Sequence, residues 1–495
     1  MKPTPFSRIR SLMQTLVPAL IVALSGCMVG PDYKAPDLTQ AAQWQAPRPH
    51  DGSQSNLLEW WQQFQDPALN TLLNQAESGS PSLEQAVARI TQARANLDIS
   101  NATLWPSLTG RAGYTRGNQQ QGSVGVANTS SGSLDAAWEL DLFGKQRRTS
   151  EAAQARVEAR VDDWYDARIS LAAEVADNYV QYRGCELLVE AYRQQADSQQ
   201  ETLRLTRVSR NAGFTAPADV ALAEASAASS ASSLIEQRSQ CDLLVKSLVE
   251  LTGMPETDVR QTLANPTTPL PQPSEMKVES VPADLLRQRA DLASSERELA
   301  ATSAEIGVAE ADRWPNLSLS GTLTVSSTGG DSTRLWSVGP ALSLPLFDAG
   351  QRKAQVTKSQ AAYDEALASY KQTLRTAVTE VEQALVRLDA AAHREADGVT
   401  AATRYQDYFN AIDRQWKAGG GSLLDREAAR RSALTAEINL ISLRENRVRY
   451  WIALYKALGG GWDSSTATAA PGNTTSGTTY SNSNHSTVAE QGDAS

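Results

Sequence analysis

The sequence predicts an internally duplicated α+β membrane protein, in which each chain supplies four strands to a shared barrel and two long coiled-coil hairpins. Three observations lead to this prediction. A tryptophan-proline motif opens two similar stretches, one in each half of the chain. Four segments beside these motifs show the alternation of apolar and polar residues that is typical of strands. The stretches that follow are alanine-rich and almost free of glycine and proline, which favours extended helices over a compact core.

The order of the motifs defines the duplication. Trp-Pro-Ser-Leu at residues 105–108 opens a polar run that ends in Leu-Phe-Gly-Lys-Gln-Arg at 142–147. Trp-Pro-Asn-Leu at 314–317 opens a similar run that ends in Leu-Phe-Asp-Ala-Gly-Gln-Arg at 346–352. A long helix-like stretch follows each run. The predicted divisions are repeat 1 (residues 79–253), a proline-rich link (254–281) and repeat 2 (282–462).

The first 26 residues are typical of a lipoprotein signal peptide. Lys2, Arg8 and Arg10 precede an apolar stretch that is too short to cross a bilayer as a helix. The segment ends in Leu-Ser-Gly-Cys, which resembles a bacterial lipobox and predicts lipid attachment to Cys27. The residue after the cysteine, Met28, resembles that of lipoproteins sorted to the outer membrane. The alternative is an ordinary signal peptide followed by a chance cysteine.

Composition limits the partners and the chemistry of the chain. The formal net charge is −10, which argues against nucleic acid as a partner. His50, His393 and His485 are the only histidines and lie far apart, and the sequence contains neither a phosphate-binding glycine loop nor a nucleophile elbow. We therefore expect no enzyme, no metal site and no cofactor apart from the lipid on Cys27.

Four segments have a period of two, and the predicted strands are 107–117, 132–143, 316–326 and 334–347. Each is roughly ten residues long, the length of a tilted strand that crosses a bilayer with lipid on one side and water on the other. A half-buried sheet in a soluble protein shows the same alternation and is the alternative. Four strands cannot close a membrane barrel, so copies must share one, and the sequence leaves a dimer, a trimer and a tetramer open.

The helical stretches show a coiled-coil pattern. Leu367, Leu374, Val381 and Leu388 recur every seven residues, and Tyr370, Ala377, Ala384 and Ala391 form a parallel series. The predicted helical hairpins span residues 149–253 and 350–458, with glycine-rich tips near Gly213 and Gly419. The N-terminal equatorial segment, 27–78, is expected to wrap the middle of these helices. The polar residues 463–495 are expected to form a disordered tail.

Several motifs together resemble one known family. They are the lipobox with Val-Gly-Pro-Asp-Tyr at 29–33, the paired Trp-Pro-x-Leu strands, Leu-Leu-Arg-Gln-Arg-Ala-Asp at 285–291 and the closing segment 454–462. In this order they resemble the outer-membrane efflux channel lipoproteins of the TolC and OprM family, also called NodT-type outer membrane factors. One departure is Ala290, where the family commonly has proline.

The resemblance implies a homotrimer. Its twelve-stranded outer-membrane barrel would continue into a twelve-helix periplasmic barrel that docks on an inner-membrane pump through a periplasmic adaptor, or membrane fusion protein. The implied function is a passive exit channel of a tripartite efflux system, lipid-anchored in the bacterial outer membrane. Drugs or other small toxic molecules are the expected substrates, although the sequence does not separate them from metal ions or proteins. A periplasmic scaffold or adaptor lipoprotein without a pore is the alternative function.

The predicted periplasmic gate lies at the hairpin tips. Duplication makes Asp219 and Asp425 equivalent, and in a threefold assembly such residues form rings of like charge that attract cations. The resemblance aligns Leu424 with an apolar constriction and Trp416 with a tip aromatic involved in closure. Ala428 stands where relatives often carry a second acid. The alternative for each is an ordinary solvated or packed tip residue.

The two remaining cysteines lie at similar distances from the first tip. Cys185 precedes Phe214 by 29 residues and Cys241 follows it by 27. Antiparallel helices would bring them nearly level, and the periplasm is oxidising, so we predict a disulfide between them. Two free buried thiols are the alternative.

Overall fold

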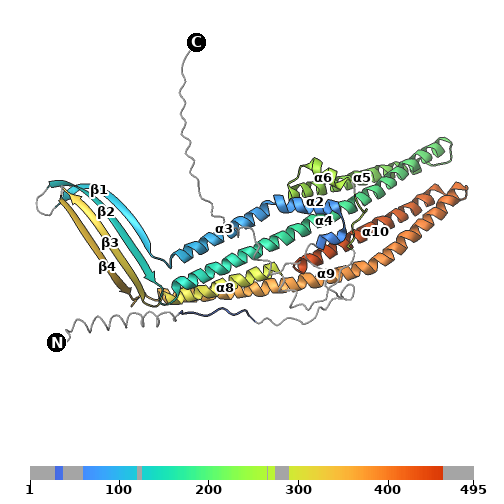
Figure 1. The fold of residues 1–495 in the computed structure, drawn as a ribbon. Helices are drawn as coiled ribbons and strands as arrows, with labels where there is room; N and C mark the ends of the chain where they lie inside the picture. The colour runs from blue at the N-terminus through green and yellow to red at the C-terminus, as the bar shows by residue number, and fades with distance from the viewer. Residues whose placement is uncertain are drawn as a thin grey trace, which may run out of the picture.

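The computed structural model describes residues 28–36, 60–119, 125–264, 266–273, 289–329 and 331–460. A four-stranded sheet forms one end of an elongated molecule, and long helices run from it to two hairpin tips at the opposite end (Figure 1). The predicted signal peptide, Cys27 and the predicted tail at 463–495 lie outside the described residues. Among the described residues, no helix combines the length and the hydropathy that a membrane span needs.

Both repeats contribute to the sheet. Its strands are β1(Ser107–Gln119), β2(Gly125–Leu140), β3(Asn316–Thr328) and β4(Asp331–Ser343). They pair antiparallel in the order β1-β2-β3-β4, so the central β2–β3 ladder joins the two repeats. The sheet edges are therefore β1 and β4, one from each repeat.

The two faces of the sheet differ in polarity, as the alternation predicts. Gly110, Leu134, Leu323 and Trp336 form one row across the four strands on the apolar face. Asp135 lies on the polar face, where it accepts a hydrogen bond from Thr322 Oγ1 (2.8 Å). The apolar residues are widely exposed in the single chain, which is the pattern of a lipid-facing surface.

The strand boundaries correct the sequence predictions. The second strand begins at Gly125 instead of residue 132, because backbone pairing with β1 and β3 continues through small polar residues that carry no hydrophobic signal. It ends at Leu140, since Asp141 accepts hydrogen bonds from the first turn of the next helix. The fourth strand spans Asp331–Ser343 instead of 334–347. Its pairing with β3 begins three residues earlier, through polar residues, and it ends two residues before Pro345, which has no N–H to donate. The first and third strands extend two residues further than predicted, to Gln119 and Thr328.

Corresponding helices of the two repeats have equal or nearly equal lengths. The six long ones are α3(Pro81–Ala102), α4(Lys145–Asn211), α5(Pro217–Thr252), α8(Ala290–Ala311), α9(Gln351–Lys417) and α10(Leu423–Ala457). Helices α4 and α9 each contain 67 residues, which corresponds to about 100 Å at 1.5 Å per residue. Helices α3 and α8 each contain 22 residues. The two repeats thus have the same order of long helices and strands.

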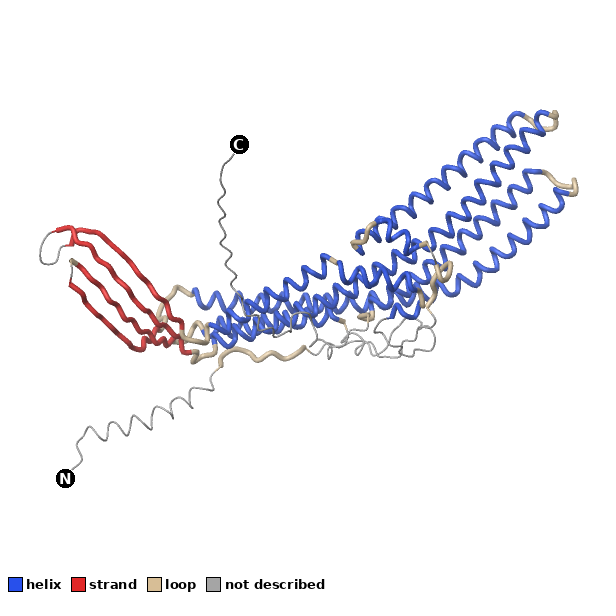
Figure 2. The backbone as a smooth tube through the Cα atoms, turned by 45° about the horizontal axis from the view of Figure 1, so that its top comes forward, coloured by secondary structure: helices blue, strands red, loops and turns tan. Residues whose placement is uncertain are grey.

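The long helices form a layer with α4 at its centre. Near the sheet, α4 packs against α3 and α8, and α8 packs against α9; towards the tips, α4 packs against α5 and α10, and α10 against α9 (Figure 2). The predicted heptad residues of α9 face these contacts: all are buried except Leu367, which is half-buried. The coiled-coil prediction is confirmed for this helix.

The main core lies at mid-length, where η2(Trp60–Phe64), α2(Pro67–Gly79) and α6(Glu256–Leu263) cover the long helices. The ring of Trp60 stacks on Tyr455 of α10, with centroids 4.9 Å apart. Beneath it, buried Tyr179 donates to Asp66 (2.6 Å) and accepts from the Arg183 guanidinium (3.0 Å). These contacts fix the short helices against α4 and α10.

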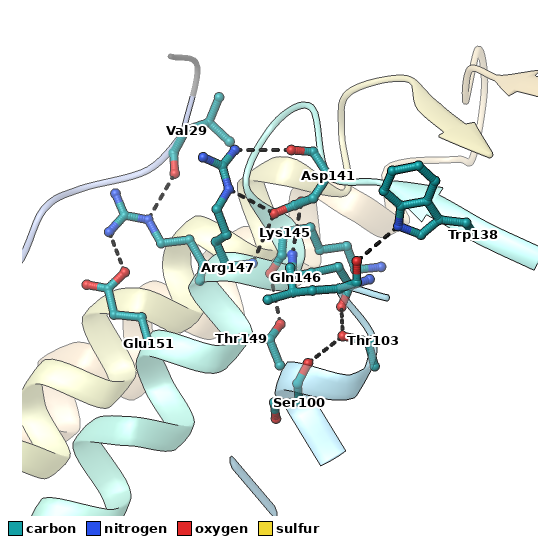
Figure 3. Close-up of polar contacts among 12 residues, drawn as sticks. Val29, Ser100, Thr103, Trp138, Asp141, Lys145, Gln146, Arg147, Thr149 and Glu151 are labelled. Carbon is teal, nitrogen blue, oxygen red and sulfur yellow. Dashed lines mark hydrogen bonds and ion pairs between the residues drawn. The ribbon is translucent and has the colours of Figure 1, made fainter. Parts of the chain in front are cut away.

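At the neck between sheet and helices, carboxylates cap both long helices. Asp141 accepts hydrogen bonds from the backbone N–H of Gln146 and Arg147, each 3.0 Å, and Trp138 donates to a carbonyl of the preceding loop (Figure 3). In the second repeat Asp348 caps α9 and accepts from Arg352 Nη1 (3.1 Å). A carboxylate at a helix N-terminus interacts favourably with the helix dipole and so stabilises the helix. Both repeats therefore hold the start of their long helix at the neck in the same way.

Candidate functional site

The candidate site comprises the two tips farthest from the sheet. Residues 212–216 connect α4 to α5, and residues 418–422 connect α9 to α10. Gly213 and Gly419 adopt left-handed conformations with φ of 83° and 82°. Their N–H groups donate to the backbone carbonyls of Arg210 and Trp416. Each long helix therefore ends in a turn whose backbone conformation favours glycine.

The predicted gate carboxylates occupy equivalent positions in the first turn of the returning helices. Asp219 accepts a hydrogen bond from the Ala216 N–H (3.3 Å). Asp425 accepts one from the Ser422 hydroxyl (2.7 Å), and that hydroxyl accepts one from the Asp425 N–H (3.0 Å). In the single chain these carboxylates therefore act as helix caps. Leu424 is 58% exposed, so the single chain does not bury its side chain.

Trp416 lies under a charged cluster that the sequence analysis missed. The guanidinium of Arg426 lies 4.9 Å from the ring centroid of Trp416. Arg426 also donates to Asp413 of α9 (2.6 Å) and to Glu427 (2.7 Å). Hydrogen bonds from Lys417 and Arg426 hold the pKa of Asp413 below its usual value. We call Asp413, Trp416, Lys417, Arg426 and Glu427 the tip cluster.

The tip cluster also joins the two hairpins. Glu427 is 5% exposed and accepts a hydrogen bond from Gln199 of α4 (3.2 Å). One turn further along α10, Arg430 donates to the backbone carbonyl of Gln194 (3.2 Å). The second hairpin is therefore fastened to the first by polar contacts. By helical rise, Glu427 lies about 6 Å from the start of α10 and Gln199 about 18 Å from the end of α4. The four-residue spacing of Asp413 and Lys417 on one helix is a signal for their ion pair, but no sequence pattern indicated the contact to α4.

The structure joins the two cysteines of the first hairpin. Cys185 of α4 and Cys241 of α5 form a disulfide, with their Cα atoms 5.7 Å apart. The side chain of Gln237 donates to Cys185 Sγ (3.1 Å). The loop closed by this bridge contains the first tip, whereas Ala391 and Arg447 hold the equivalent positions of the second hairpin.

A largely buried carboxyl group, with its side chain 14% exposed, lies where α10 packs against α4. Glu445 of α10 packs directly on Gly184 of α4, where an added Cβ would come within 2.3 Å of the carboxyl oxygen. The nearby guanidinium of Arg449 donates to Asp177 of α4 (2.7 Å). Burial raises the pKa of Glu445 to about 7, an effect that Arg449 opposes and Asp177 reinforces.

This raised pKa predicts a pH dependence of stability. The ordinary pKa of an unfolded glutamate is about 4.3, so between about pH 4.5 and 7 the folded state binds more protons and stability falls as pH rises. Glu445→Gln has no carboxyl group to ionise, so we expect the variant to be more stable than the original protein at pH 8 by about 2 kcal/mol. This value is smaller than the full pKa shift implies, because the side chain is partly exposed to solvent. Thermal unfolding followed by circular dichroism at pH 5 and pH 8 measures it. Parallel curves for the two proteins at both pH values would refute the assignment.

A groove along the tip half lies between α9 and α10 and has a volume of about 780 Å³. Polar residues such as Asp397, Asn439 and Asn446 line it beside Tyr405. In the part of the chain that the structure describes, no group of three or more His, Cys, Asp or Glu residues could hold a metal ion.

Comparisons with known proteins agree with this geometry. A family model described as outer membrane efflux protein matches residues 72–254 and 281–460. The antibiotic efflux pump outer membrane protein ArpC of Pseudomonas putida is 30% identical over 482 residues, covering 93% of this chain and 97% of its own. Nodulation protein T of Rhizobium leguminosarum bv. trifolii is 29% identical over 460 residues, covering 90% and 97%.

The fold also matches a solved channel. The structure of the outer-membrane channel OprN aligns with a TM-score of 0.77 and 34% identity, covering 88% of this chain and all of that one. The alignment therefore covers most of this chain and the whole of the channel chain.

Proposed function

Because the chain belongs to the outer membrane efflux protein family and is an outer-membrane exit channel that extends into the periplasm, we propose that three copies close one barrel and one tunnel. Twelve strands and twelve helical positions result from threefold closure. The observation that carries this proposal is that both layers of the chain are open at two edges. In the sheet these edges are β1 and β4, whose outer backbone groups need partners in lipid.

The helical layer supports the same closure. Its edge helices towards the tips, α5 and α9, expose apolar side chains that soluble helices normally bury. Ile235 of α5 and Val399 of α9 each lie 18 residues from their tip, about 27 Å along the helix. The edge residues concerned are Leu222, Ile235 and Leu243 on α5, and Val386, Val399, Tyr405 and Tyr408 on α9. A neighbouring copy would cover both sets at matching heights.

We further propose that the channel works passively in a tripartite system. A periplasmic adaptor would dock on the outside of the helices, and an inner-membrane pump would supply the energy. Drugs or other small toxic molecules are the proposed substrates, which is supported by the name of the Pseudomonas putida relative.

The gate is proposed at the tips. In a trimer, Asp219 and Asp425 would form two rings of carboxylates, and exposed Leu424 would face the axis beside them. The tip cluster would hold the second hairpin in the closed position, with Trp416 packed beneath Arg426.

Lipid attachment to Cys27 is proposed to hold the channel at the membrane, and contacts of the following residues support this. Gly30 packs against Gly307 of α8 so closely that an added Cβ would lie 2.3 Å from the Gly307 Cα atom. Buried Arg148 donates to Asp32 (2.7 Å) and to the carbonyl of Val29 (3.4 Å). These contacts hold residues 29–32 against α4 and α8, and Met28 lies against Gly144 at the start of α4. Of the proposed equatorial segment, residues 60–78 cover the middle of α4.

Conductance in planar bilayers tests the gate and the channel together. We expect the purified protein to show a small, cation-selective conductance, because the tips are closed and ringed by carboxylates. Leu424→Ser should raise the conductance by widening and wetting the constriction, and Asp425→Ala should raise it and lower the cation selectivity. Ala428→Ser, which changes an exposed residue one turn from Asp425, serves as the control. Absence of any conductance in all four proteins would contradict the proposed assembly.

A further inference from the structure

Two arginines lie on the apolar face of the sheet. Positions directly opposite each other in the ladders share a face, so Arg116 of β1 falls on the same side as Tyr114, and Arg334 of β4 on the same side as Trp336. Among the described strand residues, this face carries no acidic side chain. A cation there would lose its hydration in lipid unless it lies at headgroup level.

The two arginines occupy equal heights. Arg116 lies nine residues beyond Ser107, the periplasmic start of β1, and Arg334 lies nine residues before Ser343, the periplasmic end of β4. Nine residues correspond to about 30 Å along a strand, or about 23 Å of height at a 40° tilt. This height is close to the roughly 25 Å apolar band of an outer-membrane barrel, so both side chains reach its outer boundary.

An aromatic ring lies below each arginine. Tyr114 and Trp336 each lie two residues from their arginine, on its periplasmic side. Their side chains are 68% and 76% exposed. Amphipathic rings at this level are typical of the membrane–water interface. The pattern of an interfacial aromatic with an arginine above it thus occurs on both edge strands.

A third arginine shows the contrast between the faces. Arg111 of β1 lies on the polar face, where its guanidinium is 3.7 Å from the carboxylate of Asp135. Arg116 and Arg334 are exposed, and no ion pair with either is found among the described residues. Their charge is therefore available to a partner outside the chain.

We propose that Arg116 and Arg334 bind a phosphorylated headgroup of a lipid in the outer leaflet. The inference rests on the barrel proposed above, in which β1 of one chain meets β4 of the next and brings the two arginines to each of three boundaries. Guanidinium groups suit phosphate because their planar donors match its oxygens. The aromatic rings would pack against the upper acyl chains, and the bound lipid would bridge neighbouring chains.

Native mass spectrometry of the detergent-extracted trimer with added lipid A, a bisphosphorylated glycolipid, tests this proposal. The variants are Arg116→Gln with Arg334→Gln, the same pair changed to lysine, and Arg111→Gln as the matched control on the opposite face. The glutamine pair should weaken lipid A retention by more than about tenfold, since each interfacial arginine contributes about fivefold. The lysine pair keeps the charge but loses the planar donors, so its retention should fall between that of the glutamine pair and that of the original chain, and Arg111→Gln should match the original chain.

The outcomes separate this proposal from the proposed assembly. Equal retention of lipid A by the original chain and the glutamine pair overturns the headgroup site alone, because the trimer peak is still present. Equal retention of lipid A and phosphatidylcholine, or complete competition by inorganic phosphate, also overturns a site for the lipid. Absence of a trimer in the original chain overturns the assembly and this site with it.

Discussion

Replacing Arg426 with alanine is expected to increase the open probability of the channel at least about tenfold. The variant removes the group that joins Asp413 of α9 to Glu427 of α10 and covers the Trp416 ring. It leaves Glu427, which is almost fully buried, without its guanidinium partner. Loss of one partner from a buried ion pair costs about 3 kcal/mol, and half of that already corresponds to a tenfold change in an equilibrium. Because Glu427 also accepts from Gln199, the substitution disturbs one of the two polar contacts between the hairpins.

Single-channel recording measures this effect, with Arg404→Ala as the matched control. Arg404 lies on α9, the partner helix of α10, and pairs with Asp407 (3.2 Å), but both side chains are mostly exposed and a pair of this kind contributes little. The control should conduct like the original chain. If Arg426→Ala and Arg404→Ala both leave the conductance unchanged, the tip cluster does not hold the channel closed.

The class of fold could be predicted from the sequence because each element has a strong local pattern. Strand alternation around Leu134 and Leu323 and the heptads through Leu374 are one-dimensional signals, and the structure places these residues as expected. The prediction of an efflux channel of this family is confirmed by the comparisons. Residues 125–131 were missed as a strand because their side chains are small and polar, and their place in the sheet depends on pairing with both neighbours.

The candidate site was only partly predictable, for a different reason. Asp219 and Asp425 were found through the duplication, which is a relation within the sequence. The bond from Gln199 to Glu427 joins residues 228 positions apart on helices that meet through tertiary packing. The crossing of Glu445 over Gly184 is of the same kind, since a helical glycine has meaning only when the opposing side chain is known. Contacts between the two repeats were therefore beyond the sequence patterns.

Removing the disulfide with Cys185→Ser and Cys241→Ser is expected to speed amide hydrogen exchange in the tip half of the first hairpin at least about tenfold. The bridge closes a loop with a sequence separation of 56 that contains the ends of α4 and α5 and the tip between them. For a loop of this size the chain-entropy model gives about 4 kcal/mol, and a third of that already suffices for a tenfold change in local opening. The bridge is the only disulfide among the described residues.

The second hairpin supplies an internal control for this experiment. It has almost the same helix lengths, but Ala391 and Arg447 occupy the positions of the two cysteines, so exchange in α9 and α10 should not depend on the bridge. Reductant should reproduce the effect of the double substitution in the original chain and add nothing to the variant. Equal acceleration in both hairpins would mean that the substitutions loosen the whole layer. The disulfide links α4 to α5, whereas the tip cluster lies in α9 and α10. We therefore infer that the disulfide keeps the first hairpin rigid while the second hairpin moves relative to it.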